Sequence, residues 1–600
     1  MTRPRTTQEF IHWLEMGTGS RWIAWAALSF GVVAFSSLVA WKQFHGPASE
    51  VTLVQADTAW QLAAGEGFTT RVNFPQTAAV LHARGTPFDP AVPYPELHHA
   101  PLYSLVVAAA LRLLPGGYRA SLFASPPVPP DGFAADYFLL AINVGLLWWA
   151  AWLTFTLGRR LFEPRVGATA AVALLVSAPV WQQTVKVNGL PLLMVLALIG
   201  FHIWFRAEEA LSLGHGRKRA LGWLAALGAV CGLLFLAEYS AGALVVVVLG
   251  YAGARLRGAH RIGGIALVVA GFALLTTPWL IRNVSLTGNP VALASQNVAL
   301  KAGDPTAEPA TFRATFSPEG PRLDLNKLGN KALTALQENL TTRFWSGGAL
   351  WLAAFFVVGV LYSFRSPTAE RLRWIFLVAL GVWLLAQGTF NSGESERWAT
   401  IWCVPLVLIF GAAFFFVLLS SNVRLKSWPG TAMAILLFAQ ALPLAHDLLE
   451  PRRLHFHYPP YFPALFQGMR TDLARRSVEG RVGLMADVPA GVAWYAGTRA
   501  WAQPSRLRDF YALTLEQPMG QLLLTPRTLD RPFFTELNAR TGSTAGALTP
   551  GPGRFGEWGN IYAGLLTGTM PAEFPLRSSQ KLAENLFVLF DPSLPVGSGK

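Results

Sequence analysis

The residues best suited to chemistry follow the first long apolar stretch of the chain. The segment QADTAWQLAAGEGFTT, residues 55–70, contains one aspartate, Asp57. Aspartate is a favoured helix N-cap, the residues after it form helices readily, and Gly65 and Gly67 can end such a helix. Propensity alone therefore favours a cap. A capping carboxylate still keeps one oxygen free, and at a water interface this oxygen could accept a proton from an alcohol.

Further polar residues lie in the same segment and in later loops. Walker-type phosphate loops, dinucleotide-binding glycine patterns, nucleophile elbows and the His-Glu-x-x-His motif are absent from the sequence. Adjacent histidines seldom bind one metal together, so polar residues at an interface are the simpler interpretation of His98 and His99. The remaining polar candidates are Glu66, Arg71, His82, Arg84, Asp89 and Glu96 in the first loop, and Lys186, Asn188, Arg282, Lys301, Glu394, Glu396 and Arg397 later on.

The composition places this chain in a lipid bilayer. Its 600 residues are 52% hydrophobic and 14% charged, whereas a soluble domain has about 25% charged residues. Apolar runs of about 17 to 24 residues recur from Trp22 to about His446, and each is long enough to cross the hydrocarbon core as a helix. We therefore expect a polytopic α-helical membrane protein.

The basic residues set the topology that we predict. The formal net charge is +14, but the basic clusters lie between the apolar runs, as cytoplasmic loops require, rather than in a nucleic-acid-binding patch. Every cluster is cytoplasmic only with eleven spans, an inner N-terminus, a retained first helix and an outer C-terminus. These spans are residues 22–41, 134–157, 166–185, 190–206, 220–237, 240–254, 262–281, 346–364, 374–390, 398–420 and 430–446.

Three regions lie outside the membrane in this topology. Residues 42–133 form a first external loop, in which the short apolar segment 101–117 is predicted to be a juxtamembrane helix, because counting it as a span would invert every later loop. Residues 283–345 form a second loop with leucines at helical spacing, which predicts either a helix on the membrane or a structured connector. Residues 447–600 alternate helix and strand signals and predict a small external α/β domain after the membrane domain, residues 1–446.

Few ionisable or reactive groups lie within the predicted spans. Lys186 and Glu238 are near the external ends of spans, which favours chemistry at the surface over passage through the membrane, although Glu238 could equally be an interfacial carboxylate. Cys231 and Cys403 are the only cysteines, and both lie in apolar runs. A disulfide framework and a cysteine-based metal site are therefore excluded.

Several motifs together resemble the GT-C superfamily of membrane glycosyltransferases, which includes protein O-mannosyltransferases and the lipid A aminoarabinose transferases. ADTAWQLAAGEGFTT is similar to the first external loop of that family, and HHAPLY is similar to its His-Pro-Pro-Leu-Tyr element. TPWLIRNVSLTGNPV resembles the signature Pro-Trp-x-x-Arg-Asn-x-x-x-x-Gly, and ESERWATIWCVPL resembles a late Glu-Arg-Tyr segment. DVPAGVAWYAGTRA looks like the outer C-terminal domain of many bacterial members. The motifs occur in the family's order, over residues 55 to about 500.

The resemblance implies transfer of a sugar from a polyprenyl-phosphate carrier to an acceptor outside the membrane. Asp57 matches the acidic position and would be the general base of an inverting displacement. The resemblance implies no particular cofactor. Dependence on a divalent metal stays open, but the first loop has no Asp-x-Asp pair that would indicate a metal site. The candidates for contacts with the lipid phosphate or the sugar are His99, Tyr103, Lys186, Glu238, Arg282 and Arg397, of which Arg282 could equally be an interfacial anchor.

One position departs from the family pattern. Many members carry a second acidic residue after the third span, where this chain reads KVNGLPLL with Asn188 and Gly189. Asp57 then acts alone, or Glu238 or Glu396 takes the second position, or the chain is a divergent member with altered activity.

Other functions stay open from the sequence alone. They are a transporter or lipid flippase, for which buried mid-span charges or inverted repeats would be expected, an O-antigen-type ligase or polymerase, and an inactive scaffold for envelope assembly. The acceptor could be a glycan, a lipid or a protein, and no nucleic-acid partner is expected. The predicted location is the inner membrane of a bacterial cell, with the C-terminal domain in the periplasm.

Overall fold

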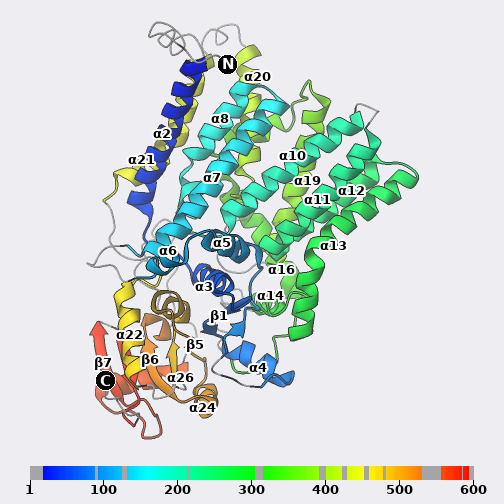
Figure 1. Cartoon of the computed structure of the whole chain (residues 1–600). Helices are drawn as coiled ribbons and strands as arrows, with labels where there is room; N and C mark the ends of the chain where they lie inside the picture. Colours follow the sequence, from blue (N-terminus) through cyan, green and yellow to red (C-terminus); the bar gives the residue numbers. More distant parts are fainter. Residues whose placement is uncertain are drawn as a thin grey trace.

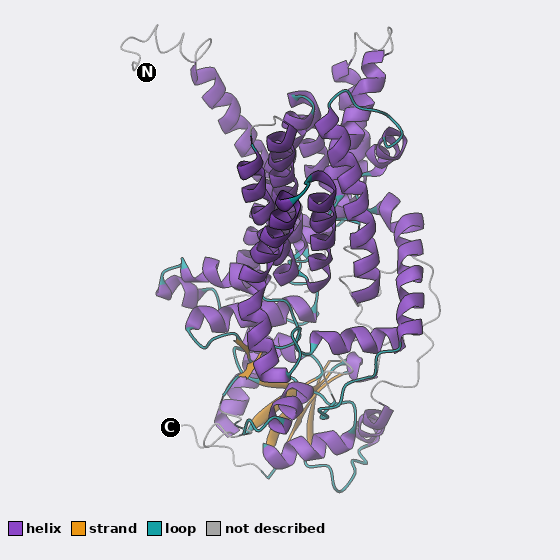
Figure 2. Cartoon of the chain, turned by 90° about the vertical axis from the view of Figure 1, so that its right-hand side faces the viewer, coloured by secondary structure: helices purple, strands orange, loops and turns teal. Residues whose placement is uncertain are grey.

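A bundle of long helices stands on a smaller part that contains all the strands, as the computed structural model shows (Figures 1 and 2). The chain therefore has an apolar helical region and, at one end of it, a region of mixed helix and sheet. The structure describes residues 18–87, 89, 92–124, 132–212, 216–303, 315–390, 400–421, 429–451, 458–476, 482–529, 556–583 and 585–593.

The helical bundle confirms the membrane-protein fold class. Among the described residues, eight helices are long and apolar enough to span a bilayer, or nine if α8 and α9, which meet at a 53° bend, form one span. The bundle helices are α2 (Thr18–Gln43), α7 (Ala134–Leu161), α8 (Pro164–Leu175), α9 (Ala178–Val185), α10 (Leu190–Ser212), α11 (Arg217–Ala237), η1 (Tyr239–Ala243), α12 (Leu244–Arg255), α13 (Ala259–Thr287), α18 (Leu350–Gly359), α19 (Pro367–Phe390), α20 (Val404–Ser421) and α21 (Pro429–Leu449).

Each of the eleven predicted spans overlaps one of these helices or helix pairs, although residues 398–399 of the tenth lie outside the described residues. Two of them are shorter than the others, because the described apolar helices there are Tyr239–Arg255 and Leu350–Gly359. The segment 101–117 contains α5 (Leu102–Arg112), which has eleven residues and is also among the shorter apolar helices. It lies at the lower end of the bundle (Figure 1), in agreement with a juxtamembrane position.

Most helices of the two loop regions predicted to be external lie at the lower end of the bundle, next to the sheet (Figure 1). The helix predicted from leucine spacing in the second loop is present as α16, and its first turn is capped by Asp324, which accepts from the backbone N–H of Asn326 at 3.0 Å. The first loop holds α3 (Glu50–Ala64), β1 (Thr69–Thr70), β2 (Val72–Asn73), α4 (Pro75–Ala83), β3 (Tyr94–Pro95), α5 and α6 (Gly116–Ser121). The second holds α14 (Ala294–Gly303), α16 (Leu325–Glu338), η2 (Asn339–Arg343) and α17 (Phe344–Ser346).

The C-terminal region is the small α/β structure that the sequence predicts. Its apolar strands are buried, as expected for a sheet with helices packed against it. The elements are α22 (Pro463–Arg476), β4 (Gly483–Ala486), α23 (Pro489–Gly491), η4 (Val492–Ala496), β5 (Ala500–Ala502), α24 (Leu507–Glu516), β6 (Met519–Leu524), η5 (Pro526–Leu529), α26 (Gly556–Thr567), β7 (Ser578–Ala583) and β8 (Leu586–Phe590).

The sheet joins the C-terminal region to the first loop. Its strand order over the described residues is β2-β5-β4-β6-β8-β7. The first four strands are parallel to one another, and β8 pairs antiparallel with both β6 and β7. Strand β2 comes from the first loop, and Val72 pairs with Ala500 and Asn73 with Trp501. A segment close to Asp57 in sequence is therefore fixed to the sheet by backbone hydrogen bonds.

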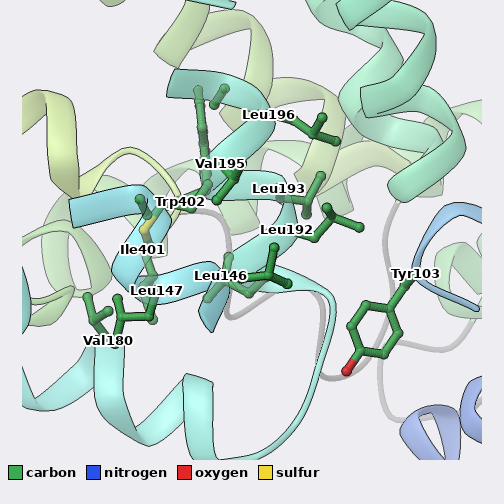
Figure 3. Close-up of a cluster of buried hydrophobic side chains, with 14 of the residues drawn as sticks. Tyr103, Leu146, Leu147, Val180, Leu192, Leu193, Val195, Leu196, Ile401 and Trp402 are labelled. Atoms are coloured by element: carbon green, nitrogen blue, oxygen red, sulfur yellow. The ribbon is translucent and has the colours of Figure 1, made fainter. Parts of the chain in front are cut away.

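The bundle core is a continuous apolar cluster that extends to the first loop. Figure 3 shows part of it, including the Tyr103 ring from α5 near leucines of the bundle. These side chains hold the loop against the helix ends, because burying an apolar side chain stabilises the folded state by about 1.5–3 kcal/mol. The labelled residues are Tyr103, Leu146, Leu147, Val180, Leu192, Leu193, Val195, Leu196, Ile401 and Trp402.

Candidate active site

Asp57 lies in the middle of α3, so the prediction that it is an N-cap is wrong. The cap is Ser49, whose side chain accepts from the backbone N–H of Thr52 at 3.3 Å. The helix begins seven residues before Asp57 because Ser49 competes successfully for the cap, and the residues that follow Ser49 form helices well enough to extend it. The predicted end is confirmed, since Gly65 adopts a left-handed conformation there with φ 97°.

The carboxylate of Asp57 is fully buried and bonded through both oxygens. Oδ1 accepts from Arg71 Nε at 2.6 Å and lies 2.6 Å from Arg71 Nη2. Oδ2 accepts from the backbone N–H of Arg71 at 2.6 Å and from the Thr70 hydroxyl at 2.9 Å. Burying a charge is costly unless it is paired and hydrogen-bonded, and here both conditions are met. The pair joins α3 to the β1–β2 segment.

A second buried carboxylate, Glu96, lies at the end of the neighbouring strand. β1 pairs with β3, with Thr70 opposite Tyr94 and Thr69 opposite Pro95, and Glu96 follows directly. Its Oε1 accepts from the backbone N–H groups of His98 and His99 at 2.7 and 3.0 Å. The two-stranded β1–β3 sheet therefore connects the segments that carry Asp57's partners and Glu96.

Glu96 also holds the ring of His99. His99 Nδ1 lies 2.8 Å from Glu96 Oε1. Burial by itself would raise the pKa of Glu96, but the charge and hydrogen bond of His99, together with His98, outweigh burial and lower it to about 2. His99 Nε2 is buried and has no hydrogen-bond partner within the described part of the chain. The histidine is therefore oriented by Glu96 and presents one unused ring nitrogen.

Arg282, from α13, binds main-chain carbonyls of the same loop. Its Nη2 donates to Phe68 O at 3.1 Å and to Glu96 O at 3.3 Å, and its guanidinium stacks on the rings of Trp279 and Phe68. Carbonyls accept hydrogen bonds without neutralising the charge. The positive charge of Arg282 is thus placed beside the loop by neutral partners, which suits stabilisation of an anion. The interfacial-anchor interpretation of Arg282 is compatible with these contacts.

The loop is closed from the bundle side by an aromatic pair. Trp279 Nε1 donates to the Tyr239 hydroxyl at 2.9 Å, and that hydroxyl lies 3.4 Å from His99 O. Tyr239 begins η1, one residue after Glu238, which is the C-cap of α11. The structure therefore places the backbone of Glu238 next to the residues that contact His99.

Tyr103 is occupied by a different network. Its hydroxyl donates to Asn143 Oδ1 at 3.0 Å and is 3.3 Å from Val187 O, and the side chain is buried. Asn143 donates in turn to Asn188 O at 2.9 Å. Burial raises the pKa of Tyr103. These contacts give Tyr103 a structural function, which connects α5 to α7 and to the turn before α10.

Asn188, at the position where an acid was expected, also has a structural function. Its Oδ1 accepts from the backbone N–H of Leu190 at 3.1 Å, at the start of α10, and its Nδ2 donates to Gln183 Oε1 at 2.9 Å. Lys186, the C-cap of α9, accepts through its carbonyl from the backbone N–H of Ala48 at 3.3 Å. Arg397, together with Glu394 and Glu396, lies outside the described residues.

Sequence patterns indicate only weakly which groups bind Asp57 and His99. Arg71, Glu96 and Tyr239 hold Asp57 and His99 in place, and sequence patterns identify only Arg71 and Glu96, as polar residues of the first loop. Arg71 follows the motif GFTT directly, so its proximity in sequence was the available signal. Tyr239 gave none, because its contact with His99 O joins residues 140 positions apart. Within the described residues, no group of three or more His, Cys, Asp or Glu side chains could hold a metal ion.

Comparisons by sequence and by structure differ in what they find. No protein-family model matches the sequence, and no curated protein matches it. The structure is similar to that of ArnT from Cupriavidus metallidurans bound to undecaprenyl phosphate, with a TM-score of 0.51 and 12% identity, over 96% of this chain and 99% of that one. The chain shares this fold over nearly its full length.

A further similar structure is the archaeal oligosaccharyltransferase AglB from Archaeoglobus fulgidus, in complex with an inhibitory peptide and a dolichol-phosphate. It has a TM-score of 0.43 and 12% identity, and the alignment covers 82% of this chain and 68% of that one.

Proposed function

We propose that this chain, which has the fold of the GT-C membrane glycosyltransferases, transfers a sugar from a polyprenyl-phosphate carrier to an acceptor at the external face. The observation that carries the proposal is the assembly of Asp57, Glu96 and His99 on the first loop, with Arg282 of α13 bound to that loop, at the end of such a bundle. The undecaprenyl phosphate in the ArnT structure supports the class of donor. The proposal leaves the sugar and the acceptor open.

The reaction is a displacement at the anomeric carbon. The acceptor oxygen forms a bond to that carbon, the bond from the carbon to the phosphate oxygen breaks, and the electron pair leaves with the lipid phosphate. The acceptor proton passes to Asp57, and the configuration inverts. Arg282 and the imidazolium form of His99, which donates from Nδ1 to Glu96 and from Nε2 to the phosphate, stabilise the departing group, because cationic N–H donors favour a developing anion.

The bonds of Asp57 restrict this role. Three hydrogen-bond donors bind the two oxygens of Asp57, namely Arg71 Nε, the Arg71 backbone N–H and the Thr70 hydroxyl, and Arg71 Nη2 adds an ion-pair contact of 2.6 Å to the same fully buried carboxylate. One must leave before a proton can be accepted. The Thr70 hydroxyl can rotate away without moving the backbone, so we propose that the acceptor hydroxyl replaces it.

A transfer assay with the purified full chain tests the base. Radiolabelled polyprenyl-phosphate sugars and candidate acceptors are supplied to the wild type, Asp57→Asn and Arg71→Gln, with Glu50→Gln as the matched control because it removes an acid from the same helix. Loss of a general base lowers turnover by about 10²–10⁴-fold, so Asp57→Asn should fall in this range while Glu50→Gln stays at the wild-type rate.

The outcomes separate catalysis from folding. If Asp57→Asn folds and transfers sugar at the unmodified rate, the proposed base is wrong. If Asp57→Asn and Arg71→Gln lose activity and unfolding temperature together, the pair is structural only. Binding of polyprenyl phosphate to the wild type, measured by native mass spectrometry, checks the donor independently, and absence of saturable binding would contradict the donor class.

A further inference from the structure

A cavity of about 380 Å³ lies between α7, α10 and α11, far from the first loop. Its walls include Trp152, Ile199, Ile203 and Trp223, and α10 packs against both other helices. Trp152 is 57% exposed and Trp223 is 37% exposed. In a membrane-spanning helix such side chains face lipid, so the cavity is an apolar groove accessible from the bilayer.

Three arginines line the same groove: Arg159 and Arg160, from the last turn of α7, and Arg206, from α10. All three are exposed. In the described part of the chain, no carboxylate pairs with Arg159 or Arg160, and Arg206 has an exposed pair with Glu209 at 3.1 Å. An exposed pair of this kind contributes little free energy. Counted over the described residues, the groove therefore carries a net positive charge.

The polar groups on the groove wall satisfy one another. Thr156 Oγ1 and His202 Nε2 are 3.2 Å apart, and His202 Nε2 is also 3.0 Å from Leu153 O. These groups leave the arginines as the polar end of the groove and the tryptophans and isoleucines as its apolar part. A ligand that matches both parts needs an acyl chain and an anionic head group.

We infer that this groove binds an anionic glycerophospholipid. Guanidinium groups bind phosphate oxygens in a bidentate manner, and basic pockets between transmembrane helices bind acidic lipid head groups. The phosphate lies against Arg159, Arg160 and Arg206, and an acyl chain lies against Trp152 and Trp223. Arg159 and Arg160 belong to the last turn of α7, whereas Asp136 near the start of the same 28-residue helix contacts Trp494 of the C-terminal region, so the groove is a lipid site separate from the candidate active site.

Native mass spectrometry of the detergent-purified full chain tests this inference. The protein is incubated with phosphatidylglycerol or with phosphatidylethanolamine of identical acyl chains, and inorganic phosphate is added in a third arm. We expect saturable binding of phosphatidylglycerol that exceeds that of phosphatidylethanolamine by roughly tenfold. Inorganic phosphate in large excess should not displace the lipid, because phosphate alone lacks the acyl-chain contacts.

Two variants test the charged part and the apolar part of the groove separately. Arg159→Gln/Arg160→Gln/Arg206→Gln removes the charge, and Ile203→Trp fills the groove with all charges kept; both should reduce phosphatidylglycerol binding by about tenfold or more. The matched control is Arg257→Gln/Arg261→Gln/Arg365→Gln, since these exposed arginines do not line the groove. The control should bind lipid as the wild type does.

Several results would overturn the inference. Equal loss in the control variant would mean that only overall charge matters. Equal retention of the two lipids by the wild type, or unchanged binding in Ile203→Trp, would show that the groove is not the site. A dimer that dissociates in Ile203→Trp would identify a second copy of the chain as the occupant. Lipid binding that arises only after removal of residues 1–17 would identify that segment as the occupant of the groove.

Discussion

At the scale of single residues, the buried carboxylates of Asp57 and Glu96 have different partners and different functions. Asp57 is held by Arg71 and Thr70, so its charge is balanced inside the loop. Glu96 is held by the backbone before α5 and by His99, so it fixes a ring whose second nitrogen is unused. A paired aspartate and an oriented histidine are complementary: one can take a proton and the other can donate to a phosphate.

The pH dependence of stability tests the Glu96 contacts. The pKa of Glu96 is lowered from 4.5 to about 2 in the folded chain. Between these two pH values the unfolded chain therefore binds more protons than the folded chain. Its contribution is fully present above pH 4.5 and is lost as pH falls towards 2. The size is up to about 3 kcal/mol. Glu96→Gln should therefore lower the free energy of unfolding at pH 7. In this variant the free energy of unfolding should also decrease less as the pH is lowered.

Unfolding of the detergent-solubilised chain, followed between pH 3 and pH 7, is the measurement. Glu50→Gln serves as the control, because Glu50 belongs to the same loop and no hydrogen bond to its side chain occurs among the described residues. Parallel curves for the wild type and Glu96→Gln would contradict the predicted contribution of this carboxylate.

At the scale of elements, α3 positions Asp57 because both of its ends are fixed. Ser49 caps its start, and Gly65 ends it with a backbone N–H directed to Gln61 O and Leu62 O. Arg112 of α5 donates to Leu62 O at 2.7 Å, and Arg119 of α6 donates to Ala63 O at 3.2 Å. Cations at a helix C-terminus also interact favourably with its dipole.

Gly65→Ala tests the importance of this helix end. An alanine at φ 97° is strained even though nothing lies within 4 Å of a Cβ built there, and the expected cost is about 1–2 kcal/mol. Thermal unfolding should show a lower midpoint, with reduced transfer because Asp57 is less well placed. Gly145→Ala is the control, since Gly145 lies in α7 with open space around it and an ordinary φ; an equal loss there would refute the argument.

At the scale of the whole molecule, the bundle and the C-terminal region share one interface. Asp136, near the start of α7, accepts from Trp494 Nε1 at 2.8 Å and from the Tyr495 hydroxyl at 3.0 Å. Strand β2 adds a backbone connection to β5. The C-terminal region is therefore attached both to the bundle and to the loop of Asp57, which gives it a physical route to influence the candidate site.

The predicted orientation of the chain can be measured with single cysteines. Both native cysteines are buried, so a membrane-impermeant maleimide should label only an introduced one. Gly117→Cys, at an exposed position in α6 with room for a side chain, should be labelled from the external side. Gly430→Cys, at the opposite end of the bundle, should be labelled only from the cytoplasm. Labelling of residue 117 only from the cytoplasm would overturn the eleven-span orientation.

The membrane architecture could be predicted from the sequence because its determinants are local. An apolar run must form a helix in lipid to satisfy its own backbone, so run length and composition were sufficient for the bundle. The short segment 101–117 was separated from the spans by charge and length. Leucine spacing indicated a helix where α16 (Leu325–Glu338) lies, and strand signals in residues 447–600 matched strands such as β4 (Gly483–Ala486) and β8 (Leu586–Phe590). The ordered motifs added the candidate loop around Asp57.

The role of each polar residue was decided only by tertiary structure. Helix propensity suggested a cap at Asp57, yet Ser49 begins the helix and Asp57 is buried against Arg71, which comes from a separate strand segment. Tyr103 and Asn188 are held by partners up to 84 positions away. The strand β2 joined a sheet that is more than 400 residues distant in sequence. Sequence determines where a helix can form, but the free energy of burying a charge depends on partners that only folding brings together.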